Sequence, residues 1–366
     1  MLSDKFTISH EQLHSAIVEI FTSIGMPYDH AKLVADVLVE AELRGIPSHG
    51  VVRIKDYLGL WSQNRLNINA KPKIEYETLS TALVDGDNGL GMISGNFAMQ
   101  SAISKANDAG TGWVAVNNSN HFGIAGYYAL MAIDHDMIGI AMTNANPTVA
   151  PTFSKQAMLG TNPIAFAVPT KNEQVFLADF ATAPIARGKI ELLEKQGKSV
   201  PKGMLQTCDG IPVTDPTAIK HGGTILPLGG DYEHAGHKGY CLTAIVDILT
   251  AVISGANFGP FVPPQVSYIK EKNNCPGKGL GHFFGAIRLD AFRPAEKVKE
   301  YMDLWIQTMR SALPIDTEQP VLIPNDPEIE MIDFHKTNGI TLLPEILNEL
   351  KKTLNELSIP IPDNLT

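Results

Sequence analysis

Cysteine is scarce in this chain of 366 residues. The three cysteines, Cys208, Cys241 and Cys275, are odd in number and form no CxxC pair. A framework of disulfides is therefore not expected, and zinc sites built on paired cysteines are excluded. This cysteine usage is typical of a protein from a reducing cytoplasm, which is the location that the sequence predicts.

Positive charge and long apolar runs are also lacking. The 29 Lys and Arg residues against 39 Asp and Glu residues give a net charge of -10, without a basic block. Nucleic acid and anionic membranes are therefore not expected as partners. The apolar stretch Tyr240–Ile253 is interrupted by Thr243 and Asp247 and is shorter than the roughly 20 residues of a membrane span. The first ten residues, MLSDKFTISH, contain no apolar run, so we expect no secretory signal.

Several well-known catalytic motifs are missing as well. The chain contains no Walker loop and no GxSxG elbow, which weakens an NTPase or hydrolase interpretation. Gly89, Gly91 and Gly95 nearly match GxGxxG, but the third glycine comes one residue late. We interpret them as a turn from a strand into a helix, not as a dinucleotide loop.

Apolar residues are plentiful, at 44% of the chain, so it can bury a sizeable core. Its length suggests two or three structural units. Residues 1–65 carry helical periodicity, and 67–79 has no clear period and is expected to be a connector. From Thr81, short β-rich runs alternate with helical patterns, and helical patterns return from Ala295. This order predicts an α/β fold with helices at both ends of the chain.

The first candidate site is Ser48-His49-Gly50 with Arg53. If Ser48 caps a third helix, His49 and Arg53 lie four residues apart on one helical face. An imidazole can transfer a proton near neutral pH, and a guanidinium can bind a carboxylate through two parallel hydrogen bonds. On spacing alone, a plain capped helix with an exposed His and Arg stays the commoner interpretation.

The second candidate is the polar run Asn117–Gly123, which includes His121 and follows a β-rich segment. Such a run opening into a helix is typical of a ligand-binding loop, and its free N–H groups could bind phosphate. A turn with an N-cap and a structural His121 explains it equally well.

The third candidate combines acidic residues and histidines in one glycine-rich loop. Its members are Asp231, Glu233, His234 and His237, followed by Lys238. The HxxH spacing falls in a loop and lacks a cysteine partner, so we expect no metal here. Lys238 opens an apolar helix and is better placed to contact a phosphate.

Together, six ordered stretches resemble the malate/L-lactate dehydrogenase family, which is distinct from the Rossmann-type malate dehydrogenases and includes ureidoglycolate, sulfolactate and diketogulonate dehydrogenases. The stretches are ELRGIPSHGVVRIKDYL, NNSNHFGIAGYYA, LGTNPIAFAVP, LADFATAPIARGKI, DGIPVTDPTA and GHKGYCLTAIVDILTAVISG. The resemblance covers about His10 to Glu330, and six motifs in order are far more specific than any one of them.

The resemblance implies an oxidoreductase that uses NAD, or possibly NADP, to interconvert a small 2-hydroxy acid and its 2-keto acid. It implies an α/β fold with a non-Rossmann cofactor domain built on a mixed sheet, flanked by a helical domain formed from both chain termini. The expected parts are 1–75, 76–290 for the cofactor domain, and 291–366. Family members are homodimers, so a homodimer is the expected assembly.

The resemblance also implies roles for individual residues. Ser48 and His49 match the proton-transfer pair, and Arg53 matches the clamp for the substrate carboxylate. His121 matches a second active-site histidine beside the nicotinamide. Further matches are Thr161 and Asn162 for the substrate and, for the cofactor, His121, Phe122, Gly123, Asp179, Phe180, Ala181, His237, Lys238, Pro324, Asn325 and Asp326. In this scheme, a cationic imidazole gives a proton to the carbonyl oxygen as hydride reaches C2.

The chain departs from the family pattern at a few positions, which leaves the substrate open. Asn325 replaces a usual glycine, although asparagine tolerates a left-handed backbone. Phe180, Ala183 and Met204 also differ from the common residues. A first alternative is an imine reductase for a cyclic imino acid, but such relatives carry an acid where this chain has Gly188-Lys189. A second alternative is a dimeric ligand-binding protein without catalysis.

Overall fold

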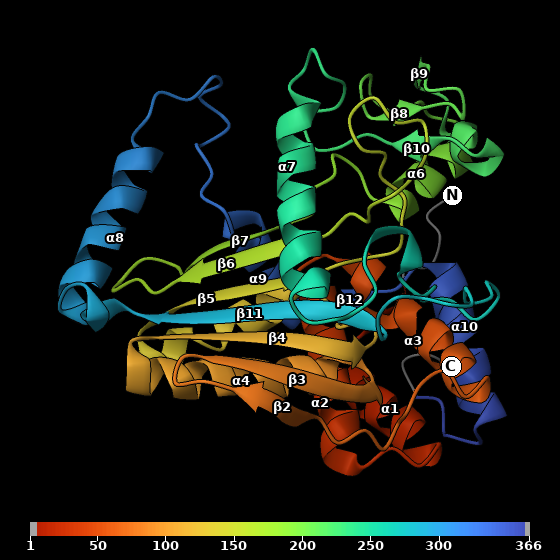
Figure 1. Cartoon of the computed structure of the whole chain (residues 1–366), viewed down its shortest axis with the longest axis horizontal. Helices are drawn as coiled ribbons and strands as arrows, with labels where there is room; N and C mark the ends of the chain where they lie inside the picture. Colours follow the sequence, from red (N-terminus) through yellow and green to blue (C-terminus); the bar gives the residue numbers. More distant parts are fainter. Residues whose placement is uncertain (1–5, 363–366) are drawn as a thin grey trace.

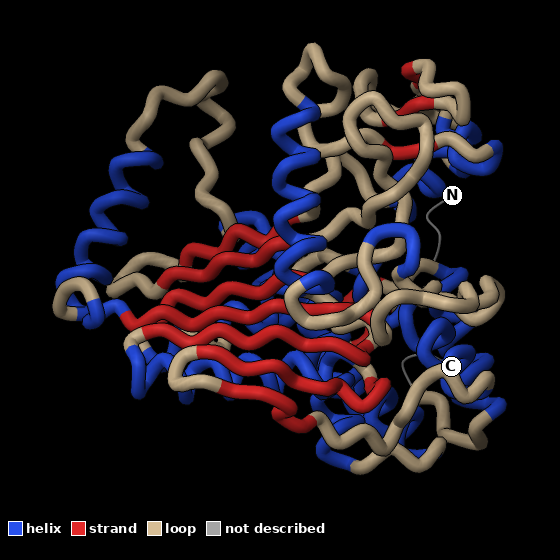
Figure 2. The backbone as a smooth tube through the Cα atoms, in the orientation of Figure 1, coloured by secondary structure: helices blue, strands red, loops and turns tan. Residues whose placement is uncertain are grey.

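The computed structural model describes residues 6–362 and contains a central seven-stranded sheet with helices around it (Figures 1 and 2). The strands, in their order across the sheet, are β2 (Lys73–Glu77), β3 (Thr81–Gly89), β4 (Thr111–Ser119), β11 (Leu280–Arg288), β5 (Met137–Thr143), β6 (Ile164–Val168) and β7 (Phe176–Phe180). A mixed α/β fold, as the alternating patterns predicted, is confirmed.

The sheet is mixed, and this separates the fold from a Rossmann domain. Only β3 and β4 run parallel, and every other neighbouring pair is antiparallel. The crossover from β3 to β4 is α4 (Gly91–Ala109), which begins at the glycines that resembled a dinucleotide loop. A methyl group at Gly91 would lie 2.3 Å from the Asn120 carbonyl oxygen, so glycine is required there for close packing. The prediction of a strand-to-helix turn is confirmed.

Helices cover both faces of this sheet and form a second core beside it. They are α1 (His10–Ser23), α2 (Tyr28–Leu43), α3 (Ile54–Ser62), α4, α5 (Ala125–Leu130), α6 (Arg187–Lys195), α7 (Gly236–Asp247), α8 (Ala295–Arg310), α9 (Asp326–Asn338) and α10 (Pro344–Glu356). Helices α4 and α5 pack on one face through small and aromatic side chains, whereas α7 rises from the other (Figure 1). Among residues 6–362, no helix combines the length and the apolar character that a membrane crossing needs.

The helical core contains segments from both ends of the chain. Buried apolar residues of α1, α2 and α3 pack against Leu347, Leu350 and Leu354 of α10. A short two-stranded pairing, β1 (Thr7–Ile8) with β12 (Ile340–Thr341), also joins the two ends. The expected helical unit built from both termini is therefore confirmed.

Two expectations about individual segments are wrong. The segment 67–79 is not only a connector, because it contains β2. All five residues of this edge strand are exposed, so it has no apolar alternation to detect. Ser48 does not cap the third helix, because the chain first forms two 3-10 turns, Pro47–His49 and Val51–Arg53, and α3 begins only at Ile54.

Candidate active site

The two 3-10 turns bring three predicted site residues into one cleft. We call the segment Pro47–Arg53 the active-site turn. Gly50 separates the two 3-10 turns, and Ser48, His49 and Arg53, from either side of it, all line the cleft. The Ser48 hydroxyl lies 2.9 Å from His49 Nδ1, and Arg53 Nε donates to the Ser48 carbonyl oxygen at 2.8 Å. Ser48 thus orients the imidazole instead of capping a helix.

His121 reaches the same cleft from the end of β4. Its imidazole ring stacks on that of His49, with 5.5 Å between ring centroids and 25° between planes. The Gly123 N–H donates to His121 Nδ1 at 3.3 Å, and the Tyr57 hydroxyl lies 2.7 Å from the same atom. Because Nδ1 accepts a backbone N–H, the proton of neutral His121 is on Nε2. His121 therefore has an N–H to donate and a fixed orientation.

Both imidazoles are neutral at pH 7 in this structure. Burial, and then the charge of Arg53, lower the pKa of His49 to about 4. Burial, followed by Arg53 and His49, also holds the pKa of His121 well below its ordinary value. The expected cationic imidazole is thus not present before an anion binds, because a cation in this cleft would lose hydration and face a guanidinium.

Arg53 is oriented for an anion from the cleft. Nε binds the Ser48 carbonyl oxygen, and Nη1 lies 3.2 Å from Asp56 Oδ2. Within residues 6–362, Nη2 makes no hydrogen bond and can bind a ligand carboxylate. Burial raises the pKa of Asp56, although Arg53 opposes the shift.

The cleft encloses about 350 Å³ and contains most of the predicted residues. The predicted residues that line it are Ser48, His49, Arg53, His121, Phe122, Gly123, Thr161, Asp179, Phe180 and Ala181. They come from the active-site turn, the end of β4, the segment before β6 and the end of β7 (Figure 1). Segments up to 133 residues apart in the chain, from Ser48 to Ala181, therefore meet at one place.

A second groove of about 370 Å³ shares Asp179 and Phe180 with the cleft and contains Pro324 and Asn325. The backbone of Asn325 is left-handed, with φ of 90°, as the sequence predicted for this replacement of glycine. Its side chain accepts from Arg44 Nη1 at 2.9 Å and donates to the Val175 carbonyl oxygen at 2.9 Å. The cleft and the groove therefore adjoin at the end of β7.

Four predicted residues lie outside both depressions. Asn162 is fully buried behind the wall, where its side chain binds Ala145 N and the Thr243 carbonyl oxygen. Asp326 pairs with Arg310 at 2.7 Å. His237 and Lys238 lie in the first turn of α7 and line neither the cleft nor the groove. Asn162 therefore holds the backbone of Ala145, which lines the cleft, from behind. Asp326, His237 and Lys238 stay predictions for cofactor contacts.

The structure also adds cleft residues that the sequence analysis did not select. They are Tyr57, through its bond to His121, and the cleft-lining Asn144, Asn146, Arg187 and Gln265. Tyr57 is 1% exposed and fits the apolar stripe of α3, so periodicity assigned it to the core. Burial raises its pKa above the ordinary value, which keeps its hydroxyl protonated as a donor. No sequence signal distinguishes this tyrosine from an ordinary core residue.

The loop before α7 does not gather its acidic residues and histidines around one point. His234 Nδ1 lies 2.7 Å from Asp231 Oδ1, whereas the His237 ring is tilted against that of Tyr232, with 4.9 Å between ring centroids. Throughout residues 6–362, no three His, Cys, Asp or Glu side chains are arranged to hold a metal ion.

Comparison with known proteins places this chain among dehydrogenases. Residues 8–351 match the family model described as malate/L-lactate dehydrogenase. The chain is 39% identical over 353 residues to malate dehydrogenase of Pyrococcus horikoshii, covering 96% of each chain. It is 40% identical over 350 residues to L-sulfolactate dehydrogenase of Methanocaldococcus jannaschii, covering 95% of this chain and 96% of the relative.

The fold comparison agrees with the sequence comparison. The crystal structure of malate dehydrogenase from Entamoeba histolytica superposes with a TM-score of 0.91 at 33% identity, covering 98% of this chain and 100% of that one. A more distant match, at 26% identity and a TM-score of 0.81, is delta1-piperideine-2-carboxylate reductase from Pseudomonas syringae, covering 95% of this chain and 99% of that one.

Proposed function

This chain belongs to the malate/L-lactate dehydrogenase family, and on that premise we propose that it is a nicotinamide-dependent dehydrogenase that interconverts a small 2-hydroxy acid and its 2-keto acid. One observation carries the proposal: the Arg53 guanidinium, whose Nη2 makes no hydrogen bond within residues 6–362, and two stacked, neutral imidazoles line the same cleft. A 2-hydroxy acid presents a carboxylate and a hydroxyl on adjacent carbons, so it needs a cation and a proton acceptor side by side.

In the proposed mechanism, Arg53 binds the substrate carboxylate and His49 transfers the proton. In the oxidation direction, neutral His49 accepts the proton of the substrate hydroxyl. In reduction, the bound carboxylate offsets the charge of Arg53, which favours the protonated imidazole at the moment when a proton is needed. His49 Nδ1 is held by Ser48, so Nε2 exchanges the proton with the substrate oxygen. A bound nicotinamide supplies hydride transfer at C2.

The cleft and the adjoining groove together offer room for a dinucleotide. His121, Phe122 and Gly123 would hold the nicotinamide end in the cleft, and Asp179, Phe180 and Ala181 would continue toward Pro324 and Asn325 in the second groove. Asp179, Glu328 and Arg44 all line this groove, and the Arg44 guanidinium already pairs with Glu40 at 2.7 Å. A 2′-phosphate would therefore meet two carboxyl groups and a guanidinium that is already paired, which supports NAD over NADP.

A substrate panel tests the proposal and its alternatives. Oxaloacetate, pyruvate, sulfopyruvate, oxalurate and diketogulonate are offered with NADH and with NADPH, together with a cyclic imino acid. Turnover of a keto acid with NADH is the expected result. One similar structure is named delta1-piperideine-2-carboxylate reductase, yet no acidic side chain follows Ala186 at Gly188-Lys189 here. Turnover of the imino acid alone, or binding without turnover, would instead support one of the two alternatives.

Tyr57→Phe tests how His121 is oriented. The change removes the hydroxyl that lies 2.7 Å from Nδ1 while keeping the buried ring. We expect kcat to fall about 5- to 13-fold, because one hydrogen bond of about 1–1.5 kcal/mol near the reacting groups is lost. Steady-state kinetics of the best keto acid measure this, and Tyr28→Phe, on an exposed side chain of α2, is the matched control. Equal rates for Tyr57→Phe and wild type would contradict the assigned role.

Lys238→Ala tests the predicted phosphate contact at the start of α7. A contact made equally in the ground and transition states contributes uniform binding, so we expect a higher KM for the cofactor and little change in kcat at saturation. Exhaustive chelation should leave the rate unchanged, because His49 and Arg53 need no metal. Activity that is lost on chelation and restored by zinc or magnesium would show that the loop before α7 binds a metal.

The proposed assembly is a homodimer in a reducing cytoplasm. The three cysteines form no disulfide in the structure. Helix α7 and the π-helical turn after it (Ile248–Val252) leave the apolar side chains of Ile245, Ile248 and Val252 exposed at 49–59%. A second copy covering this apolar face would remove it from water. Light scattering should give twice the 39.7 kDa chain mass.

A further inference from the structure

Glu42 is a buried carboxyl group directly beneath the active-site turn. It lies near the end of α2, at 3% exposure, and its Oε1 accepts from the Val51 N–H at 2.8 Å. No Lys, Arg or His in the part of the chain that the structure describes pairs with it. An unpaired buried carboxyl group costs stability, so its position calls for an explanation beyond packing.

The Glu42 carboxyl group occupies the space that a side chain at Gly50 would need. A methyl group added at Gly50 would lie 2.1 Å from Glu42 Oε1 and 2.5 Å from its carboxyl carbon. The φ of Gly50 is -94°, outside the left-handed region that favours glycine. The atoms of Glu42 nevertheless leave no room for a side chain at this position.

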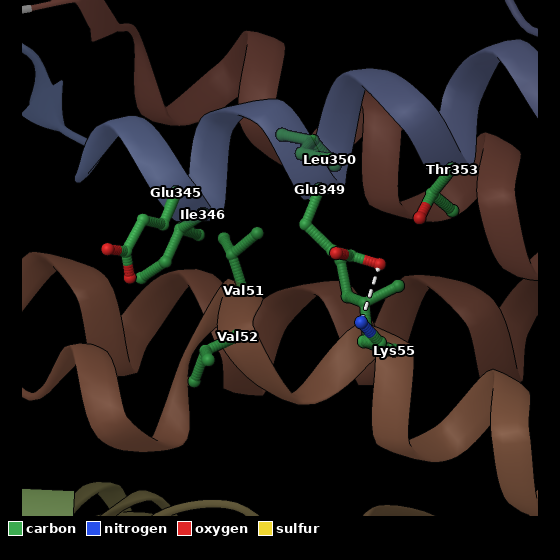
Figure 3. Close-up of a pocket in the computed structure, with 9 residues that line it drawn as sticks. Val51, Val52, Lys55, Glu345, Ile346, Glu349, Leu350 and Thr353 are labelled. Atoms are coloured by element: carbon green, nitrogen blue, oxygen red, sulfur yellow. Dashed lines mark ion pairs between the residues drawn. The ribbon is translucent and has the colours of Figure 1, made fainter. Parts of the chain in front are cut away.

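The bond from Val51 lies at the start of the helical segment that carries Arg53 and Tyr57. The first N–H groups of such a segment lack partners within it, and an oxygen from elsewhere must bind them. Glu42 supplies that oxygen from α2. On the other side, the side chains of Val51 and Val52 face Ile346 and Leu350 of α10, beside the ion pair of Lys55 with Glu349 at 3.0 Å (Figure 3).

We propose that Glu42 is a positioning residue that fixes the active-site turn through the Val51 N–H, so that His49 and Arg53 meet the same substrate. The inference rests on the proposed function for its kinetic consequences. His49 and Arg53 flank Gly50 and Val51, and a shift of the Val51 amide therefore moves the proton acceptor and the carboxylate clamp relative to each other. Displacements of about 1 Å at a reacting centre can cost about 100-fold in rate.

The oxygen of Glu42 is the important feature, not its charge. Burial raises the pKa of Glu42 to about 7, against the opposing effect of the Val51 hydrogen bond. A neutral carboxyl group still has a carbonyl oxygen that can accept this bond. Glutamine at the same position keeps the shape and the acceptor, whereas methionine keeps the length and removes the acceptor.

The test compares Glu42→Gln with Glu42→Met. For Glu42→Gln we expect kcat/KM for the keto acid within about threefold of wild type, and for Glu42→Met a fall of about 10- to 100-fold. The dissociation constant for NADH, from its fluorescence, should change less than about twofold in both. Ile17→Ala, a change in the helical core on α1, controls for a general loss of stability. Glu349→Gln, which removes the ion pair with Lys55, controls for the contact between the active-site turn and α10.

Three kinetic results would overturn the proposal. The first is a kcat/KM of Glu42→Met within about twofold of wild type. The second is an equal loss of kcat/KM in Ile17→Ala, compared at a matched melting temperature. The third is a kcat/KM of Glu42→Gln as low as that of Glu42→Met. Gly50→Ala adds an independent check. The loss of kcat/KM caused by Gly50→Ala should be smaller in the presence of Glu42→Ala, because that change removes the Glu42 atoms with which the new methyl group would overlap. If the losses of the two single variants simply add in the double variant, the result counts against the contact.

Hydrogen exchange separates this inference from the proposed function. Exchange of the peptide covering residues 47–56 is followed by mass spectrometry in the wild type and the two variants. Glu42→Met should exchange faster there and Glu42→Gln should not, whether or not any acid is turned over. Unchanged exchange in Glu42→Met would overturn the positioning role, whereas a wild type inactive on the whole panel would overturn only the proposed function.

Discussion

Replacing His49 with alanine should lower kcat by about 100-fold or more and leave the affinity for NADH nearly unchanged, because proton transfer by a positioned side chain contributes about 100- to 10,000-fold. The imidazole lies in the cleft with Nδ1 bound to Ser48 and Nε2 left for the substrate. Alanine removes that proton acceptor without filling the cleft. Steady-state kinetics in both directions, together with fluorescence titration of NADH, measure the two effects.

His121→Ala is the comparison that assigns the roles of the two histidines. Its Nδ1 accepts from Gly123 and lies beside the Tyr57 hydroxyl, so it is built to donate a hydrogen bond from Nε2, not to shuttle a proton. We therefore expect a weaker loss of kcat than in His49→Ala, and weaker binding of the cofactor. If His49→Ala kept most of its kcat while His121→Ala lost it, the two assignments would be exchanged.

Arg53→Lys should reduce kcat/KM for 2-keto acids by about 100-fold, although the charge is kept. A guanidinium offers two parallel N–H groups to a carboxylate, whereas an ammonium group is a single point charge. The lysine also cannot bind both the Ser48 carbonyl oxygen and Asp56 as Arg53 does at 2.8 and 3.2 Å. Substrate saturation curves measure the effect, and most of it should appear in KM.

Lys55→Gln provides the matched control for Arg53→Lys. Lys55 lies two residues further along, on the far side of the turn, and pairs with Glu349 in the open groove by α10 (Figure 3). Exposed ion pairs contribute about 0–1 kcal/mol, so this variant should stay within about twofold of wild type. A kcat/KM for Arg53→Lys that also stays within about twofold would contradict the clamp assignment.

Local patterns predicted the individual elements well. The periodicity from Ala295 to Arg310 corresponds to α8, and the glycine-rich segment after β3 is a turn into α4. Ser9 accepts from the Gln12 N–H at 3.2 Å, which is the bond that a serine just before a helix commonly forms. Such features depend on residues within about one turn of each other, so the sequence contains all the information that they need.

The family motifs predicted the composition of the cleft but not its supports. Ser48, His49, Arg53, His121 and Asp179 were selected from the sequence, and all line the cleft. The expected boundaries 1–75, 76–290 and 291–366 stay predictions, although the helical core does combine both ends of the chain. Asn162 was selected as a substrate contact, yet its buried amide holds the wall from behind.

The α/β class, the helices and the set of polar residues follow from local properties of the chain, namely periodicity, capping and motif order. The contacts of Tyr57 with His121 and of Glu42 with Val51 arise only on folding, since these pairs lie 64 and 9 residues apart and depend on how helices pack. The neutral state of His49 also arises on folding, because its pKa depends on burial and on the nearby charge of Arg53. Desolvation and field strength are properties of the folded environment, and no pattern of residue types along the chain encodes them directly.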